Sequence, residues 1–175
     1  VGETVKIGFF TQEFPKVAPN VRLIDFMRDI AEYVETPDGR FSASQMLEQF
    51  LFPPDVQYTP VERLSGGEKR MAAIATILAM QPKIMLMDEP STALDPKNRR
   101  TLIRTLNALP VTKIIATHDL DLVLETCDRV LLLHDGQIAA DGPAWEILRD
   151  RALLERHSLE LPFCLAGVPE RAKKS

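Results

Sequence analysis

Residues 84–87, Ile-Met-Leu-Met, form a continuous apolar run that ends directly in two carboxylates, Asp88 and Glu89. A short run without polar alternation is typical of a strand buried on both faces, as in a parallel sheet covered by helices. Two acids at the carboxyl end of such a strand lie where open α/β sheets bind their ligands. This feature predicts an α/β fold with a polar site at one edge of its sheet.

The flanking segments alternate between strand and helix patterns, which also favours an α/β sheet. Apolar side chains at helical spacing predict a helix over residues 22–36, ended by Pro37-Asp38-Gly39. Asp95-Pro96 is typical of a helix start, and Asp135-Gly136 between two apolar runs predicts a β-hairpin. The other expected elements are strands at 4–10 and 113–117, helices at 42–50, 71–78, 120–127, 143–148 and 153–159, and a tail after Pro162.

Leu64-Ser65-Gly66-Gly67-Glu68 is a second polar segment, placed before an apolar helical stripe. Ser65 and Glu68 have the spacing of a capping box. The two adjacent glycines let the backbone approach a ligand closely, and free N–H groups at a helix start attract anions. A glycine-containing turn capped into a helix explains the same residues, so the segment alone leaves both interpretations open.

The two acids suit metal-assisted hydrolysis. A carboxylate such as Asp88 can hold Mg²⁺, usually through water, and Glu89 can polarise an attacking water as a general base. A second apolar strand ends in Thr117-His118-Asp119, where His118 can donate a hydrogen bond to a phosphate oxygen. A solvated strand end and a structural histidine are the competing interpretations.

Composition narrows the function classes. A net charge of −4 argues against a generally basic nucleic-acid-binding surface. The longest mainly apolar stretch, residues 71–80, is too short to span a bilayer, so any membrane association is expected to go through a partner. Cys127 and Cys164 are too few for a disulfide framework or a zinc site, which indicates free cytosolic thiols. His134 and His157 are expected to be structural or surface residues.

Taken in order, Leu-Ser-Gly-Gly-Glu, a strand ending in Asp-Glu-Pro, then Ala-Leu-Asp, then a strand ending in Thr-His-Asp resemble the ATP-binding-cassette (ABC) ATPase superfamily over about residues 3–160. The resemblance implies ATP and Mg²⁺ as cofactors. It implies that Asp88 is the Walker B aspartate, which holds the metal, and that Glu89 is the catalytic base. It also implies that Gln12 is the Q-loop glutamine, which is catalytic and associated with the metal, and that His118 is the catalytic switch histidine. Asp95 is implied to be the D-loop aspartate. The implied signature loop, which contacts nucleotide held by an opposite cassette, consists of Ser65, Gly66, Gly67 and Glu68.

The resemblance divides between two classes. Residues 1–70, with Val-Lys-Ile-Gly-Phe-Phe-Thr-Gln-Glu-Phe, resemble the ABC-F class of soluble proteins, several of which act on ribosomes. Residues 64–162, with Ala-Thr-His-Asp-Leu-Asp-Leu-Val, resemble the ATPase subunit of energy-coupling-factor importers of the cobalt and nickel kind. Glu89-Pro90-Ser91-Thr92 departs from the Glu-Pro-Thr-Asn that is usual in ABC-F proteins. A hybrid joined near the shared Leu-Ser-Gly-Gly-Glu and a divergent member of either class both fit.

None of the eight glycines lies in the phosphate-binding motif G-x-x-x-x-G-K-[ST]. The superfamily places that P-loop upstream of the glutamine, so we expect a P-loop NTPase-like sheet with a helical insertion subdomain and with the N-terminal part of the cassette missing. Residues 1–162 are expected to form this partial domain, with the helical subdomain at about 20–80 and the catalytic core at about 81–142. Residues 163–175 are expected to be a flexible tail. Without the P-loop, the isolated chain is predicted to be inactive as an ATPase.

The function that the resemblance implies is ATP hydrolysis coupled to import of a metal ion or vitamin. The expected partners are a second cassette and a membrane-embedded transport subunit. The chain would then be cytoplasmic and peripheral on the inner face of the cell membrane, without direct membrane insertion. An ABC-F translation-associated ATPase, with the ribosome as partner, is the alternative, and a hybrid or remnant that hydrolyses no ATP is the second alternative.

Overall fold

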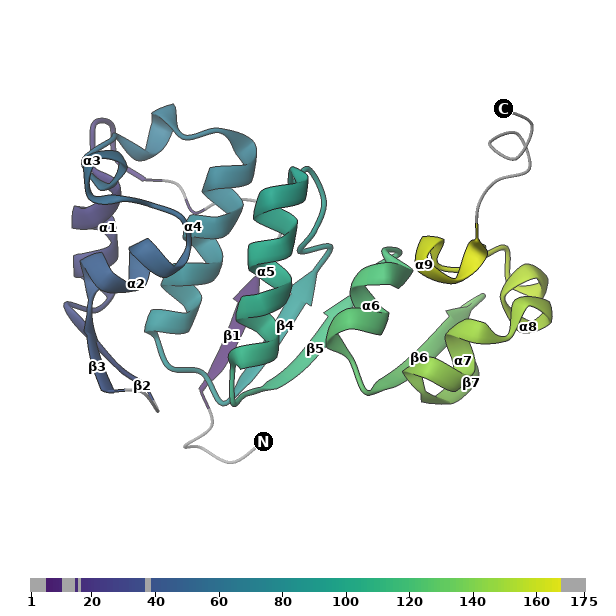
Figure 1. Cartoon of the computed structure of the whole chain (residues 1–175). Coiled ribbons are helices and arrows are strands. Elements are labelled where there is room, and N and C mark those ends of the chain that lie inside the picture. Colours follow the sequence, from purple (N-terminus) through teal and green to yellow (C-terminus); the bar gives the residue numbers. More distant parts are fainter. Residues whose placement is uncertain (1–5, 11–14, 16, 37–38, 168–175) are drawn as a thin grey trace, which may run out of the picture. The chain divides into compact units, whose positions relative to one another are not determined.

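The computed structural model describes residues 6–10, 15, 17–36 and 39–167. The chain divides into two compact units, Val1–Ala116 and Thr117–Ser175 (Figure 1). Within the described ranges, no helix combines the length and the apolar character needed to cross a bilayer.

The first unit is built on a parallel sheet with the strand order β1-β4-β5. These strands are β1 (Ile7–Phe10), β4 (Ile84–Asp88) and β5 (Thr112–Ala116). The long helices α4 (Gly66–Ala79) and α5 (Pro96–Ala108) run beside each other next to the sheet (Figure 1). A parallel sheet with packed helices confirms the predicted α/β class.

One face of the sheet is packed into the core. Met85 and Met87 of β4 are buried in one cluster with Leu102 and Leu106 of α5. Gly8 allows α4 to lie close to β1, because a Cβ at this position would be 2.5 Å from the side chain of Ile77. The absence of a side chain at Gly8 therefore sets the spacing between helix and sheet.

The other face of the sheet carries an exposed apolar row. Phe9, Leu86 and Ile114 are cross-strand neighbours in the parallel register. The side chains of Phe9 and Ile114 are 63% and 57% exposed, and Leu86 is half-buried. The prediction that residues 84–87 are buried on both faces is therefore wrong for this face, since the buried cluster that contains α4 and α5 takes only Met85 and Met87 from β4.

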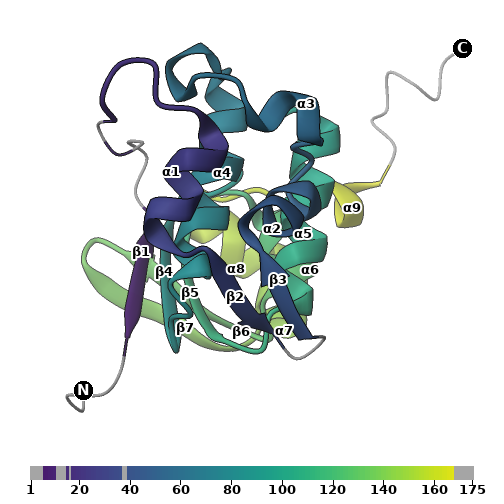
Figure 2. The same ribbon diagram turned by 90° about the vertical axis from the view of Figure 1, so that its left-hand side faces the viewer.

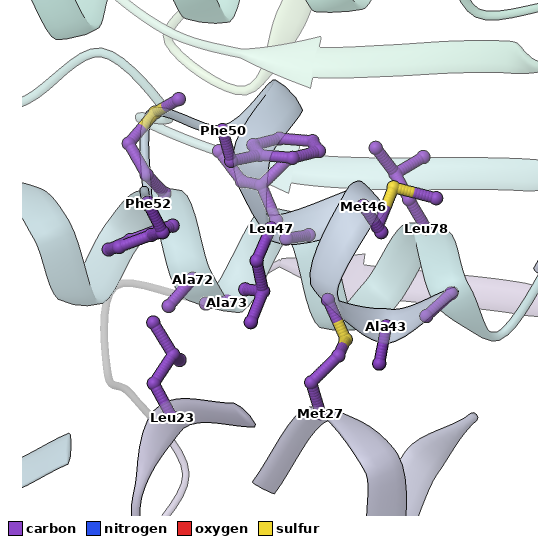
Figure 3. Packing of buried hydrophobic residues seen from close by; sticks show 14 of the residues in the cluster. Leu23, Met27, Ala43, Met46, Leu47, Phe50, Phe52, Ala72, Ala73 and Leu78 are labelled. Atoms are coloured by element: carbon purple, nitrogen blue, oxygen red, sulfur yellow. The ribbon is translucent and has the colours of Figure 1, made fainter. Parts of the chain in front are cut away.

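Shorter elements pack around α4 in the first unit. Most of them contribute side chains to one hydrophobic cluster with it, in which Leu23 and Met27 face Ala72, Ala73 and Leu47 (Figure 3). Figure 2 shows this part of the unit toward the viewer. The elements are α1 (Leu23–Ile30), β2 (Tyr33–Thr36), β3 (Gly39–Ser42), α2 (Ala43–Gln49), α3 (Pro54–Gln57) and the 3₁₀ helix η1 (Val61–Arg63).

The predicted helix over residues 22–36 is wrong in its second half. The helix α1 ends at Ile30, and residues 33–36 form β2, which pairs antiparallel with β3. Tyr33, Val34 and Thr36 are aromatic or β-branched, and such residues favour strands. The guanidinium of Arg40 also lies over the Tyr33 ring, 4.0 Å from its centroid, so a cross-strand contact replaces the helical stripe.

The second unit contains α6 (Leu120–Thr126) and an antiparallel hairpin of β6 (Arg129–His134) and β7 (Gln137–Pro143). The predicted hairpin is confirmed, because Asp135 and Gly136 both have positive φ, as a tight two-residue turn requires. Three short helices follow, namely α7 (Ala144–Arg149), α8 (Arg151–Arg156) and α9 (Phe163–Ala166).

Part of the expected tail is structured. The backbone N–H groups of Phe163 and Cys164 donate to the carboxylate of Asp121, at 2.9 and 3.0 Å, and this anchors α9 to α6. Residues 168–175 of the tail lie outside the described residues. The expected division into a helical subdomain at 20–80 and a core at 81–142 stays a prediction.

Candidate functional site

The helix α4 begins at the Ser-Gly-Gly-Glu segment with a complete capping box. The Ser65 hydroxyl oxygen accepts a hydrogen bond from the backbone N–H of Glu68 at 3.3 Å. In return, Oε2 of Glu68 accepts from the backbone N–H and the hydroxyl of Ser65, at 2.8 and 2.7 Å. The capping box predicted from the sequence is therefore confirmed, and it fixes Gly66 and Gly67 in the first turn of the helix.

Gly67 lies against the loop that follows β4. A Cβ at Gly67 would be 3.6 Å from the carbonyl oxygen of Ala93 and 3.6 Å from Nδ2 of Asn98. A Cβ at Gly66 would meet nothing within 4 Å. The glycine pair is therefore open on one side, and its other side contacts the segment that carries Asp95.

Asp95 caps the start of α5. Its two carboxylate oxygens accept from the backbone N–H and the side-chain amide of Asn98, at 2.8 and 2.9 Å. Glu68, Asp95 and Asn98 line one small pocket of about 170 Å³. Asn98 was not among the residues predicted from the sequence, although its position three residues after a helix-capping aspartate was the available signal.

The two acids occupy the carboxyl end of the central strand. Asp88 is the last residue of β4 and is exposed, with Ala116 as its neighbour on β5. The backbone N–H of Glu89 donates to the carbonyl oxygen of Ala116 at 2.9 Å. Glu89 has φ of +47°, a conformation that is uncommon outside glycine and that clusters at functional sites. The chain therefore turns sharply at the proposed base.

Arg70 links the glycine-pair helix to this turn. Its Nη1 donates to the backbone carbonyl oxygen of Glu89 at 2.6 Å, and its guanidinium lies 5.9 Å from the centroid of the Phe10 ring. Arg70 was not predicted from the sequence, because nothing in the pattern separates it from the neighbouring Lys69. The structure thus brings together residues 65–70, 88–89 and 93–98 within the first unit.

Gln12 and His118 are the two remaining residues that the resemblance selected. Gln12 lies outside the described residues. His118 is an exposed residue at the start of the second unit. Its role, like that of Gln12, stays a prediction from the resemblance.

The acids fit a metal that is bound mainly by nucleotide phosphates. Among the described residues, no group of three or more His, Cys, Asp or Glu side chains could hold a metal ion. Mg²⁺ is usually held by one or two carboxylates, water and substrate phosphates. The exposed carboxylate of Asp88 suits that arrangement, with no protein cage required.

Comparisons with known proteins identify the family of the chain. Residues 14–125 match the family model described as "AAA domain, putative AbiEii toxin, Type IV TA system". The chain is 57% identical over 102 residues to the "Putative ABC transporter ATP-binding protein gll0289" of Gloeobacter violaceus, covering 58% of this chain and 42% of that protein. It is 32% identical to the energy-coupling factor transporter ATP-binding protein EcfA of Carboxydothermus hydrogenoformans, covering 93% of this chain and 73% of that protein.

Solved structures show the same fold. The dimeric ATP-binding cassette MJ0796, bound to ADP and Pi, superimposes with a TM-score of 0.64 at 26% identity, covering 80% of this chain and 63% of that chain. The protein cbiO1 of Clostridium perfringens, part of the ABC transporter complex cbiONQ, also gives a TM-score of 0.64 at 26% identity, covering 86% of this chain and 62% of that chain. The sheet and its helices therefore define an ATP-binding-cassette fold.

The family model covers more than half of the chain, and the Carboxydothermus protein is matched over most of both lengths. The chain belongs to that AAA-domain family and to the ATP-binding proteins of ABC transporters. It spans about two fifths of the length of the relatives that it matches at 49–57% identity.

Proposed function

We propose that this chain is the nucleotide-hydrolysing part of an energy-coupling-factor importer, where it couples ATP hydrolysis to uptake of a metal ion or a vitamin. The observation that carries this proposal is the match to Carboxydothermus EcfA, which extends over 93% of this chain. The likeness to cbiO1, a part of the ABC transporter complex cbiONQ, supports it. In this role the chain lies in the cytoplasm and attaches to the membrane through a transport subunit.

The acids at the end of β4 have separate roles in the proposal. Asp88 holds Mg²⁺ through its exposed carboxylate, and Glu89 takes a proton from the attacking water. When bound, the metal neutralises charge on the phosphates of ATP. Arg70 acts on Glu89 only through the backbone carbonyl, so it is a positioning residue. By resemblance, Gln12 contacts the metal and His118 contacts a phosphate oxygen.

The open side of the glycine pair suits contact with a second cassette. Gly66 has free space around it, and the N–H groups at the start of a capped helix favour an anion. Ser65, Gly66 and Gly67 therefore contact the nucleotide of the opposite cassette, with Glu68 fixing Ser65 and Asp95 fixing the neighbouring loop. The dimeric state of the related cassette MJ0796 supports a cassette dimer as the working unit.

The ABC-F role is the second candidate, and the pattern of residues 1–70 favours it. Relatives at 49–57% identity cover only 58–63% of this chain, which fits a change of class within the sequence. Against this role, the descriptions of these relatives name ABC transporters and not the ABC-F class. The third candidate is a hybrid or remnant that does not hydrolyse ATP, and a measurement of ATP turnover tests it.

A restored cassette tests the proposal. We define it as this chain joined downstream of the P-loop segment of Carboxydothermus EcfA. Co-expressed with the membrane subunits of that importer, it is expected to copurify with them and to hydrolyse ATP, and Glu89→Gln is the inactive control. Sedimentation with ribosomes but not with the membrane subunits would instead favour the ABC-F role.

A further inference from the structure

A cavity of the first unit lies at the end of the sheet opposite the two acids. It has a volume of about 750 Å³, within the range of small-molecule sites. Lys6, Lys83 and Val111 line it, and each directly precedes a strand of the sheet, namely β1, β4 and β5. Asp88 ends β4, five residues after Lys83, so the Cα atoms of Lys83 and Asp88 are roughly 16 Å apart at the usual rise per residue of a strand.

The cavity has an apolar floor made of core side chains. Val34 of β2, Met46 of α2, the adjacent Phe50 and Leu78 of α4 all line it and are all less than 10% exposed. Met46 and Leu78 lie side by side in Figure 3. A floor of this kind offers few polar groups, so it suits the apolar body of a ligand and not a sugar or a nucleotide.

The rim of the cavity is cationic. Lys6, Lys83 and Arg104 line it and are exposed, and none of them has a side-chain hydrogen bond or ion pair to the described part of the chain. Glu35, the acid at the rim, is 3.6 Å from the guanidinium of Arg40. The rim therefore keeps a net positive charge.

Basic residues near the C-terminal end of a helix often serve only to neutralise its free carbonyl groups. For α5 that role is filled by Lys113, whose Nζ donates to the carbonyl oxygen of Leu106 at 2.6 Å. Arg104 is therefore not needed to neutralise the end of α5 and is available to bind a ligand.

The wall of the cavity is held in place. Nε2 of Gln81, in the loop between α4 and β4, donates to the carbonyl oxygen of Glu35 on β2 at 2.7 Å. This bond joins two lining segments that are 46 residues apart in the sequence. A tethered wall favours a preformed cavity, which lowers the entropy cost of binding.

We propose that this cavity binds an anionic amphiphile, a medium-chain carboxylate whose apolar body lies on Met46, Phe50 and Leu78 and whose carboxylate faces Lys83 and Arg104. The apolar floor selects the hydrocarbon chain of the ligand, and the unpaired cations select its carboxylate head group. The site is separate from the acids of the nucleotide site, and the proposal does not depend on the importer role.

Displacement of the fluorescent probe 11-(dansylamino)undecanoate from the full chain tests this. Decanoate is expected to displace the probe from one saturable site, and decanol and decyltrimethylammonium are expected to bind at least tenfold more weakly. Arg104→Glu and Lys83→Glu should each weaken decanoate binding at least fivefold and leave decanol unchanged. Lys97→Glu, a charge reversal on the exposed part of α5 outside the cavity, is the matched control and should change neither.

A steric variant gives a second readout. Ala108 lines the cavity and is exposed, so Ala108→Trp should narrow the mouth without entering the core, and should weaken both decanoate and decanol. Equal affinity for decanoate and decanol, or decanoate binding that is insensitive to Arg104→Glu, would overturn the proposal. Binding only to vesicles containing phosphatidylglycerol, with no displacement by free decanoate, would also overturn it.

Discussion

The guanidinium of Arg70 donates a hydrogen bond to the backbone carbonyl oxygen of Glu89, 2.6 Å away. This contact joins the start of α4 to the turn at the end of β4, where Glu89 has a left-handed backbone conformation. A single side chain thereby fixes the spacing between the glycine pair and the proposed catalytic base.

Replacing Arg70 by Met should lower the free energy of unfolding by about 1.5–3 kcal/mol, the usual range for a hydrogen bond to a charged group. The loss arises because the carbonyl of Glu89 loses its partner in a partly buried place. Urea denaturation of the full chain measures it. Lys69→Met is the matched control, since Lys69 donates only to the exposed carbonyl of Glu62, and a change of similar size there would contradict the argument.

Gly67 should tolerate a small side chain for folding but not a charge for function. A Cβ there would have ordinary contacts at 3.6 Å, so Gly67→Ala is expected to change the free energy of unfolding by no more than about 1 kcal/mol. Gly67→Asp adds a negative charge to the start of α4, next to the open side at Gly66 where the nucleotide phosphate is proposed to bind. In the restored cassette it should abolish ATP-driven dimerisation measured by light scattering. Normal dimerisation of that variant would show that the loop does not act on the opposite cassette.

Glu89→Gln should abolish turnover in the restored cassette and keep ATP binding. General base catalysis typically contributes roughly 10²–10⁴-fold, and the amide cannot accept the proton from water. The backbone contacts of Glu89 to Arg70 and Ala116 do not involve its side chain, and Gln keeps an oxygen that can accept from the Thr92 hydroxyl as Oε2 of Glu89 does at 3.5 Å, so the fold should be unchanged. Phosphate release and equilibrium nucleotide binding separate these effects. A variant that hydrolyses ATP at the wild-type rate is incompatible with the assignment.

The 175-residue chain by itself should bind Mg·ATP weakly and hydrolyse none measurably. The sequence contains no P-loop to supply a backbone N–H nest, a lysine and a hydroxyl to the phosphates. Asp88 and Glu89 without that loop repel a polyanion. Titration calorimetry is the measurement. A micromolar dissociation constant, on the order of −8 kcal/mol, would reveal a phosphate site elsewhere in the chain.

The exposed row on the sheet should promote self-association. Phe9 and Ile114 flank Leu86 across the strands, and contiguous exposed apolar groups of this kind favour aggregation. Phe9→Ser and Ile114→Ser should reduce association in sedimentation velocity experiments while changing the free energy of unfolding by less than about 0.5 kcal/mol. Tyr58→Ser, an exposed aromatic away from the sheet, is the control and should leave association unchanged.

Local chemistry allowed much of the fold to be predicted from the sequence. Three predicted features depend on residues within three positions of each other, namely the Ser65–Glu68 capping box, the Asp95 cap and the Asp135-Gly136 turn. The spacing of these residues in the sequence was therefore enough to predict the hydrogen bonds and the turn. The apolar run at 84–87 predicted a strand for the same reason. The second half of the helix at 22–36 was mispredicted, because pairing of β2 with β3 outweighed helical periodicity.

The tertiary structure decided everything that joins distant segments. Arg70 reaches Glu89 across 19 positions, and Gly67 meets Ala93 only because α4 packs beside the loop after β4. The cavity floored by Met46 and Leu78 and rimmed by Arg104 likewise combines three separate elements. Hydrogen bonds within a few residues follow from backbone geometry alone, whereas contacts between separate elements depend on how apolar faces pack. The sequence already identified Asp88 and Glu89 as candidate site residues, whereas the residues that surround them are known only from the folded chain.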